Sequence, residues 1–219
     1  MASRMMHLAA VQELEKEIGF SDADRFKLGI LLPDACAGTV STTVSHLKTK
    51  ICGGKRITYR LSAFRTAYGE RMRTDKLYLG YYLHLVQDLL YRHFLYTEYH
   101  FDPVAEEKRR GLYRDYALLN SYLIQKYRIR EDLVIPPDLE RESLFAIGPF
   151  DYERLTRDFR ADFASRRDTE PDFLTPERAD EYVERAVERC LREIQALEAG
   201  SALMDEREYA WASHGMEMK

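Results

Sequence analysis

The segment from Asp75 to Tyr99, DKLYLGYYLHLVQDLLYRHFLYTEY, constrains the fold more than any other part of the chain. Its residues are apolar or aromatic almost all round, and Thr74 and Asp75 can cap a helix at its start. A helix on the surface of a protein normally keeps one polar face, which this segment lacks. We therefore expect a helix of about 25 residues in the centre of a bundle.

The segments on either side of this helix predict further helices and one short hairpin. Capping residues, prolines and apolar spacing mark the helix ends. The expected helices run from Ser3 to Gly19, from Ser21 to Pro33, from Asp102-Pro103 through Tyr127, from Asp151 onward, and from Thr175 to near Gly200. The only plausible β-structure is KTKIC-GG-KRITYR, turning at Gly53-Gly54. The expected fold class is all-α, a helical bundle around a long buried central helix with at most one short β-hairpin.

Length and composition indicate one soluble domain over residues 1–219. The chain is 45% hydrophobic, enough for a substantial core, and shows no long linker. We expect the metal site described below in residues 1–100, further helices in 101–200 and a tail in 201–219. Neither a signal peptide nor a membrane span is evident, so a cytoplasmic location is expected. The net charge of −4 gives no reason to expect general nucleic-acid binding.

His84 and Asp88 are four residues apart on the central helix, so both side chains leave the same face. Gly80, one turn earlier, is expected to leave space beside them. An unpaired carboxylate would be costly on a buried face, and a metal ion is one group that would compensate it. Two simpler alternatives are a direct hydrogen bond between His84 and Asp88 and a pairing of Asp88 with Arg92.

Three earlier residues extend this pair into a candidate metal site. His7 lies on the inward face of the first expected helix, Asp34 follows a helix end, and His46 lies in a loop rich in hydroxyl groups. Each of them alone is more simply a structural residue. Together with His84 and Asp88 they supply the imidazole and carboxylate ligands that suit zinc, manganese or iron.

The order and local sequence of these residues resemble the zinc-dependent phospholipase C family of helical metallohydrolases. The motifs are a histidine in the first helix, GILLPDA with Gly29, Pro33 and Asp34, the pair Ser45-His46, and LGYYLHLVQD from Leu79 to Asp88. They cover roughly residues 5–100. The resemblance implies an all-helical fold and hydrolysis of phosphate esters with clustered zinc ions.

By the same resemblance, Asp34, His46, His84 and Asp88 surround one ion, and His7 with Asp88 as a bridge holds a second. Asp34 would also orient or deprotonate the attacking water. The family's secreted members use their mature amino-terminal residue as a ligand and are made with a signal peptide, whereas this chain starts MASRMM. They also carry a later HxxxE helix. Its counterpart is missing, because no glutamate follows four residues after His93, His100 or His214. One or two ions are therefore expected, with zinc preferred and manganese or iron as alternatives.

The residues from His46 to Lys76 include nine lysines and arginines but only two acids, Glu70 and Asp75. This charge would attract a small anionic substrate, although a solvated loop is the simpler alternative. The expected substrate-binding residues are Lys48, Lys50, Arg60 and Arg65. The sequence thus predicts a metal-dependent hydrolase, preferably of a phosphoester. A metallohydrolase acting on another bond, such as an amide, and a non-enzymatic helical binding or regulatory protein with a buried His/Asp network are the alternatives.

Overall fold

The computed structural model describes residues 1–35, 42–164 and 169–213. Within these ranges the α-helices are α1 (Arg4–Ile18), α2 (Ala23–Leu31), α3 (Thr42–Ser45), α4 (Leu61–Thr74), α5 (Lys76–His93), α6 (Glu106–Tyr127), α7 (Tyr152–Ala164) and α8 (Pro176–Glu198). Short helical turns are η1 (Leu32–Asp34), η2 (Phe94–Glu98), η3 (Leu139–Arg141) and η4 (Ser143–Ala146). The strands are β1 (Lys48–Ile51), β2 (Arg56–Tyr59) and β3 (Trp211–Ala212). The predicted mainly helical fold class is confirmed.

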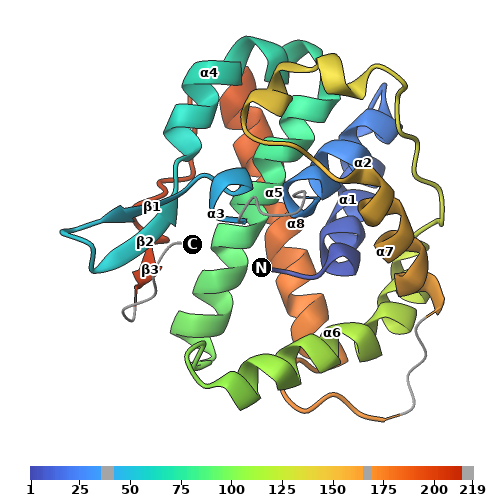
Figure 1. Ribbon diagram of the computed structural model, residues 1–219, viewed down its shortest axis with the longest axis vertical. Coiled ribbons are helices and arrows are strands. Elements are labelled where there is room, and N and C mark those ends of the chain that lie inside the picture. The colour runs from blue at the N-terminus through green and yellow to red at the C-terminus, as the bar shows by residue number, and fades with distance from the viewer. Residues whose placement is uncertain (36–41, 165–168, 214–219) are drawn as a thin grey trace.

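Helix α5 is the centre of the molecule, as its sequence predicts (Figure 1). Every residue from Leu77 to Arg92 is buried. The Asp75 side chain caps the helix by accepting a hydrogen bond from the backbone N–H of Leu77 at 2.9 Å. The helix continues beyond His93 as the single π-helical turn η2, and such turns are frequent near functional sites.

Helices α2 and α5 cross at two glycines, Gly29 and Gly80. A Cβ atom at Gly80 would lie 2.4 Å from the carbonyl oxygen of Phe26, and one at Gly29 would lie 2.1 Å from the carbonyl oxygen of Leu77. No side chain fits at either position. The expectation that Gly80 leaves space beside His84 is therefore wrong, because the backbone of α2 occupies that space.

Helix α1 begins at the predicted cap, where the Ser3 side chain accepts from the backbone N–H of Met6. The helix packs between α8, α6 and α2. Residues just before it also contact the bundle, since the Tyr116 hydroxyl donates to the carbonyl oxygen of Met1 at 2.8 Å. The first residues of the chain are thereby fixed beside the middle of α5 (Figure 1).

The predicted hairpin forms, and a third strand extends it. Strands β1 and β2 pair antiparallel with Lys48 opposite Tyr59, and β3 adds to β2 with Trp211 opposite Ile57. Strand β3 and helix α4 were not predicted from the sequence. Helix α6 begins three residues later than predicted, since Asp102 and Pro103 lie before it, where Asp102 accepts from the backbone N–H of Val104.

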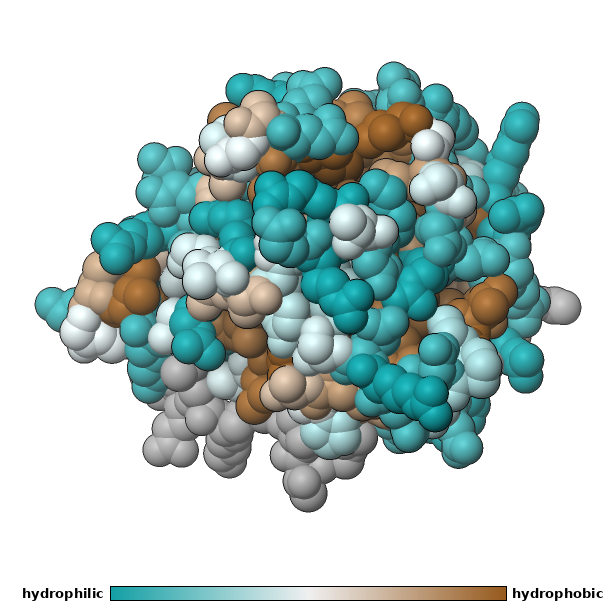
Figure 2. Space-filling view, turned by 90° about the horizontal axis from the view of Figure 1, so that it is seen from above, coloured by the Kyte–Doolittle hydropathy of each residue, from teal (hydrophilic) through white to brown (hydrophobic). Residues whose placement is uncertain are grey.

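Figure 2 looks onto the end of the molecule that carries α4. Hydrophilic residues cover most of this face, and hydrophobic residues form separate areas, the broadest of them along the upper edge of the picture. Among the described residues, no helix has the length and apolar character that a membrane crossing requires.

Candidate metal centre

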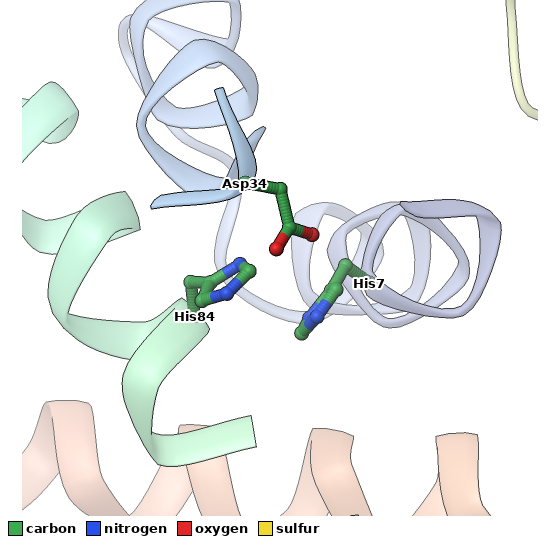
Figure 3. Close-up of side chains that lie close together, drawn as sticks. All are labelled: His7, Asp34 and His84. Atoms are coloured by element: carbon green, nitrogen blue, oxygen red, sulfur yellow. The ribbon is translucent and has the colours of Figure 1, made fainter. Parts of the chain in front are cut away.

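The five candidate ligands meet where α1, α2 and the segment around α3 pack against α5. His7 comes from α1, Asp34 from η1, His46 from the residue after α3, and His84 with Asp88 from α5. Figure 3 shows His7, Asp34 and His84 pointing toward a common space from three different segments. The side chains of all but Asp34 are completely buried, and that of Asp34 is 12% exposed.

Distances within the cluster are those of groups that face one another. The Nε2 atoms of His46 and His84 lie 3.1 Å apart. His46 Nε2 also lies 3.5 Å from Asp34 Oδ1 and 3.6 Å from Asp88 Oδ2. On the other side, His7 Nε2 lies 3.6 Å from Asp88 Oδ1, and the His7 and His84 rings stack with centroids 4.2 Å apart. Two groups of three ligands therefore share His84, namely His7, Asp34 and His84, and His46, His84 and Asp88.

The outer nitrogen of each imidazole contacts an oxygen that can accept a hydrogen bond. His84 Nδ1 lies 2.7 Å from the carbonyl oxygen of Ile30, in the last turn of α2. His46 Nδ1 lies 3.0 Å from the carbonyl oxygen of Thr42. His7 Nδ1 lies 2.7 Å from the side-chain oxygen of Gln87.

A neutral imidazole that donates from Nδ1 keeps a lone pair on Nε2. In this tautomer the three Nε2 lone pairs would be directed into the cluster. This is the tautomer that second-shell acceptors select in histidines that bind metal ions.

Asp88 receives hydrogen bonds on both carboxylate oxygens. The backbone N–H of Ala2 donates to Oδ1 at 2.8 Å, and the Tyr59 hydroxyl donates to Oδ2 at 2.9 Å. Burial alone would raise the pKa of Asp88, but the nearby amino group at Met1 and the imidazoles, His7 first among them, hold the pKa well below its usual value. The carboxylate is thus ionised at neutral pH.

The cluster combines neutral histidine rings with ionised carboxylates, so its net charge is negative. Burial is the main cause that lowers the pKa of His46, and it lowers the pKa of His84 to about 3, so both rings are neutral at pH 7. Burial raises the pKa of Asp34, whereas a hydrogen bond from His46 and positive charge on His84 would lower it, and the pKa lies below its usual value. The fully buried Asp88 and the largely buried Asp34 are therefore both ionised, and among the described residues neither has a lysine or arginine within ion-pair distance.

Two buried atoms of the cluster, His7 Nε2 and Asp34 Oδ1, have no hydrogen-bond partner among the residues that the structure describes. Leaving such groups unsatisfied costs about 1–3 kcal/mol each, and more when the group is charged. A divalent ion would satisfy both and would balance the carboxylate charge. Three imidazole nitrogens with two carboxylates are a donor set that zinc, manganese and iron accept.

The structure also bears on the two simpler readings of Asp88. The His84 ring nitrogens contact Ile30 and His46, so His84 does not hydrogen-bond to Asp88. Arg92 does not pair with Asp88 directly. Its Nε donates to the hydroxyl of Tyr59 at 3.0 Å, and Tyr59 in turn donates to Asp88.

The four predicted substrate-binding cations lie in different places. Lys48 is close to the cluster, because its Nζ donates at 3.1 Å to Thr42, whose carbonyl oxygen contacts His46. Lys50 and Arg60 are exposed to solvent. Arg65 donates to the hydroxyl of Tyr82 and lines a separate cavity between α4 and α8. The structure therefore brings only Lys48 of the four toward the candidate ligands.

Three residues that the sequence analysis did not assign to the site surround the ligands. They are Gln87, Tyr59 and Arg92, which contact His7, Asp88 and Tyr59 respectively. Gln87 was open to prediction, since it precedes Asp88 on a helix with few other polar residues. Tyr59 carried no signal, because a tyrosine in a strand is equally typical of a core.

Comparisons of the chain with family models, with curated proteins and with solved structures found no match. The function is therefore inferred from the geometry of the cluster.

Proposed function

We propose that the His/Asp cluster holds one or two divalent metal ions and that the protein is a metal-dependent hydrolase of phosphoesters. Zinc is the preferred ion, with manganese or iron as alternatives. His7, Asp34, His46, His84 and Asp88 would be the ligands. The cytosolic location and the small anionic substrate expected from the sequence stay predictions.

One observation carries the proposal. Three imidazoles whose outer nitrogens are engaged elsewhere direct their inner nitrogens toward two ionised carboxylates, and two atoms of the cluster have no partner among the described residues. A purely structural network would use these groups to satisfy one another. Here the ligand set is more than one closed tetrahedral ion requires, and an excess of ligands is what an open site or a pair of ions needs.

The chemistry follows from the ion and from two neighbouring groups. A divalent ion lowers the pKa of coordinated water from 15.7 to about 7 and polarises a phosphoryl oxygen. Asp34 is the candidate to orient the attacking water and take its proton, because it alone among the ligands is partly exposed. Water oxygen bonds to phosphorus, the ester P–O bond breaks, and the departing oxygen takes up a proton. Lys48 contributes positive charge for the phosphate.

The main alternative is a binding or regulatory protein in which the cluster is a buried polar network without an ion. A metallohydrolase acting on an amide is a further alternative, because the ligands report on the ion and not on the substrate.

The test starts with metal content. Purified protein should carry zinc, manganese or iron, and His84→Ala and Asp88→Ala should both lose it. His93→Ala is the matched control, because His93 ends the same helix but lies outside the cluster with a side chain 35% exposed. Wild-type protein that stays metal-free after incubation with zinc and manganese would exclude the metal site.

Activity is then measured on aryl phosphomonoesters and phosphodiesters with each ion supplied. The wild type and His93→Ala should hydrolyse at least one ester, and His84→Ala should not. Equal background rates for the wild type and His84→Ala across the whole panel would exclude the phosphohydrolase.

A further inference from the structure

A cavity of about 260 Å³ lies beside the cluster, between the sheet, the end of α5 and the first half of α6. None of the five candidate ligands lines this cavity, but three of its lining residues connect it to them. Met1 precedes the residue that donates to Asp88, Thr42 provides the carbonyl beside His46, and Arg92 reaches Asp88 through Tyr59.

The charge of the cavity has one sign. Lys48, Arg92 and Arg109 line it, and no aspartate or glutamate does among the described residues. The remaining lining residues are mainly aromatic or apolar, and they include Ile57, Phe101, Leu112, Tyr113 and Trp211. A ligand that suits these walls combines negative charge with an apolar group.

Arg92 is the residue that carries the inference. It is 9% exposed, yet no carboxylate lies within ion-pair distance of it among the described residues. Burying a charge without an opposite charge is costly, so such residues are usually paired. Its guanidinium lies 4.3 Å from the centre of the Trp211 ring and donates to the hydroxyls of Tyr59 and Tyr96. These contacts hold a planar, rigid donor at the cavity wall, which is the geometry that recognises phosphate.

We propose that this cavity is the substrate pocket, in which Arg92 and Lys48 bind the phosphate of a small phosphomonoester with one apolar or aromatic substituent. The inference rests on the proposed function for the reaction, but not for the binding itself. The volume of about 260 Å³ suits a small molecule. The apolar walls favour an aryl or alkyl substituent over a polyol.

The probe is phenylphosphonate, which carries both features and has no ester bond to hydrolyse. Trp211 is the only tryptophan of the chain and lines the cavity, so its fluorescence reports binding at this place. Wild-type protein, with or without chelator, should bind phenylphosphonate saturably and should bind it more tightly than inorganic phosphate. Arg92→Met and Lys48→Met should each weaken binding about tenfold or more, the effect of losing a charge-assisted hydrogen bond.

Arg189→Met is the matched control. Arg189 also donates to a tyrosine hydroxyl and lies over that ring, but at Tyr209 in another cavity. The Arg189→Met substitution should leave the affinity for phenylphosphonate unchanged. If Arg92→Met proves unstable, Arg92→Lys keeps the charge without the planar fork, and Lys48→Met tests the half-buried partner alone.

Equal affinity of the wild type, Arg92→Met and Lys48→Met would overturn the proposal, as would the absence of saturable binding to the wild type. Binding that depends on Arg92 without hydrolysis of any ester would leave the pocket in place and exclude the hydrolase. Hydrolysis that persists unchanged in both variants would leave the hydrolase in place and exclude the pocket.

Discussion

The contacts behind the ligands determine what each ligand can do. An imidazole free to rotate offers either nitrogen to solvent, whereas His84 is held through Nδ1 by the Ile30 carbonyl at 2.7 Å. The close crossing of α2 and α5 at Gly29 and Gly80 brings that carbonyl within reach. The orientation of this candidate metal ligand therefore depends on two glycines, which have no side chain.

Tyr59 offers the sharpest test at this scale, because its hydroxyl joins Asp88 to Arg92. Tyr59→Phe keeps the ring and removes only the hydroxyl. If the metal site is as proposed, loss of this outer contact should weaken metal affinity about 10- to 100-fold. Tyr127→Phe is the control, since Tyr127 also donates to an aspartate, Asp180, at 2.9 Å but contacts none of the ligands. Competition with a chelator of known affinity measures the metal affinity of each variant. Equal metal affinities of Tyr59→Phe and the wild type would contradict the role of Tyr59.

The candidate ligands could be predicted because their residue types and their spacing can be read directly from the sequence. His84 and Asp88 share a helix face by their spacing alone, and His7 lies on an apolar stripe. The contacts of Arg92 could not be predicted, because its spacing from Asp88 also allows a direct ion pair. Only the tertiary structure places Tyr59 between the two side chains. Long-range partners of this kind have no signal in a single sequence.

At the scale of elements, one ion-pair group joins three parts of the fold. Arg25 of α2 donates to both carboxylate oxygens of Asp75, the cap of α5, at 2.9 and 2.6 Å. It also donates to Glu142 at 2.7 Å, in the segment between η3 and η4. The group fixes α2 against the start of the central helix, and so supports the crossing on which His84 depends.

We expect Asp75→Asn to destabilise the protein by about 1–3 kcal/mol at pH 7, since asparagine still caps the helix but loses the charge-assisted bonds to Arg25. Burial raises the pKa of Asp75, but Arg25 and the Leu77 N–H outweigh it, so the folded pKa is below the unfolded value. The stabilisation is then present above the unfolded pKa and is lost as pH falls through the folded pKa.

Urea denaturation at pH 7 and pH 3 measures this difference. The difference in the free energy of unfolding between the wild type and Asp75→Asn should be smaller at pH 3 than at pH 7. Asp24→Asn, an exposed acid in the first turn of α2, should change stability by less than about 0.5 kcal/mol at either pH. An equally large difference in the free energy of unfolding at pH 3 would show that the stabilisation does not come from the charge of Asp75.

A helix or strand could be predicted from the sequence where its buried residues recur at a regular spacing. Helix α5 is buried all round and α8 carries a continuous apolar stripe from Tyr182 to Ile194, so both were evident. Helix α4 buries only Leu61, Phe64 and Met72, which is too little for a recognisable stripe. Strand β3 has two residues, and no local pattern marks so short an element.

At the scale of the molecule, the candidate metal centre connects parts of the chain that are distant in sequence. His7 and Asp88 are separated by 81 positions in the numbering but lie 3.6 Å apart. An ion bound between them exists only in the folded state, so it shifts the folding equilibrium by mass action.

Chelation should therefore lower the melting temperature of the wild type. An ion present at 100 times its Kd contributes about 2.7 kcal/mol, which corresponds to roughly 5–10 °C for a chain of this size. His84→Ala should melt at the same temperature with and without chelator. Differential scanning calorimetry measures both proteins, and an unchanged wild-type melting curve after verified removal of the metal would contradict the proposed connection.

The order of the ligands along the chain has a consequence for how the protein would acquire its metal. All five precede residue 89, whereas α8, against which α1 packs, begins only at Pro176. During synthesis the ribosome releases the full ligand set long before it releases the helix that covers α1. An ion could therefore reach the candidate ligands on the growing chain before α8 packs against α1.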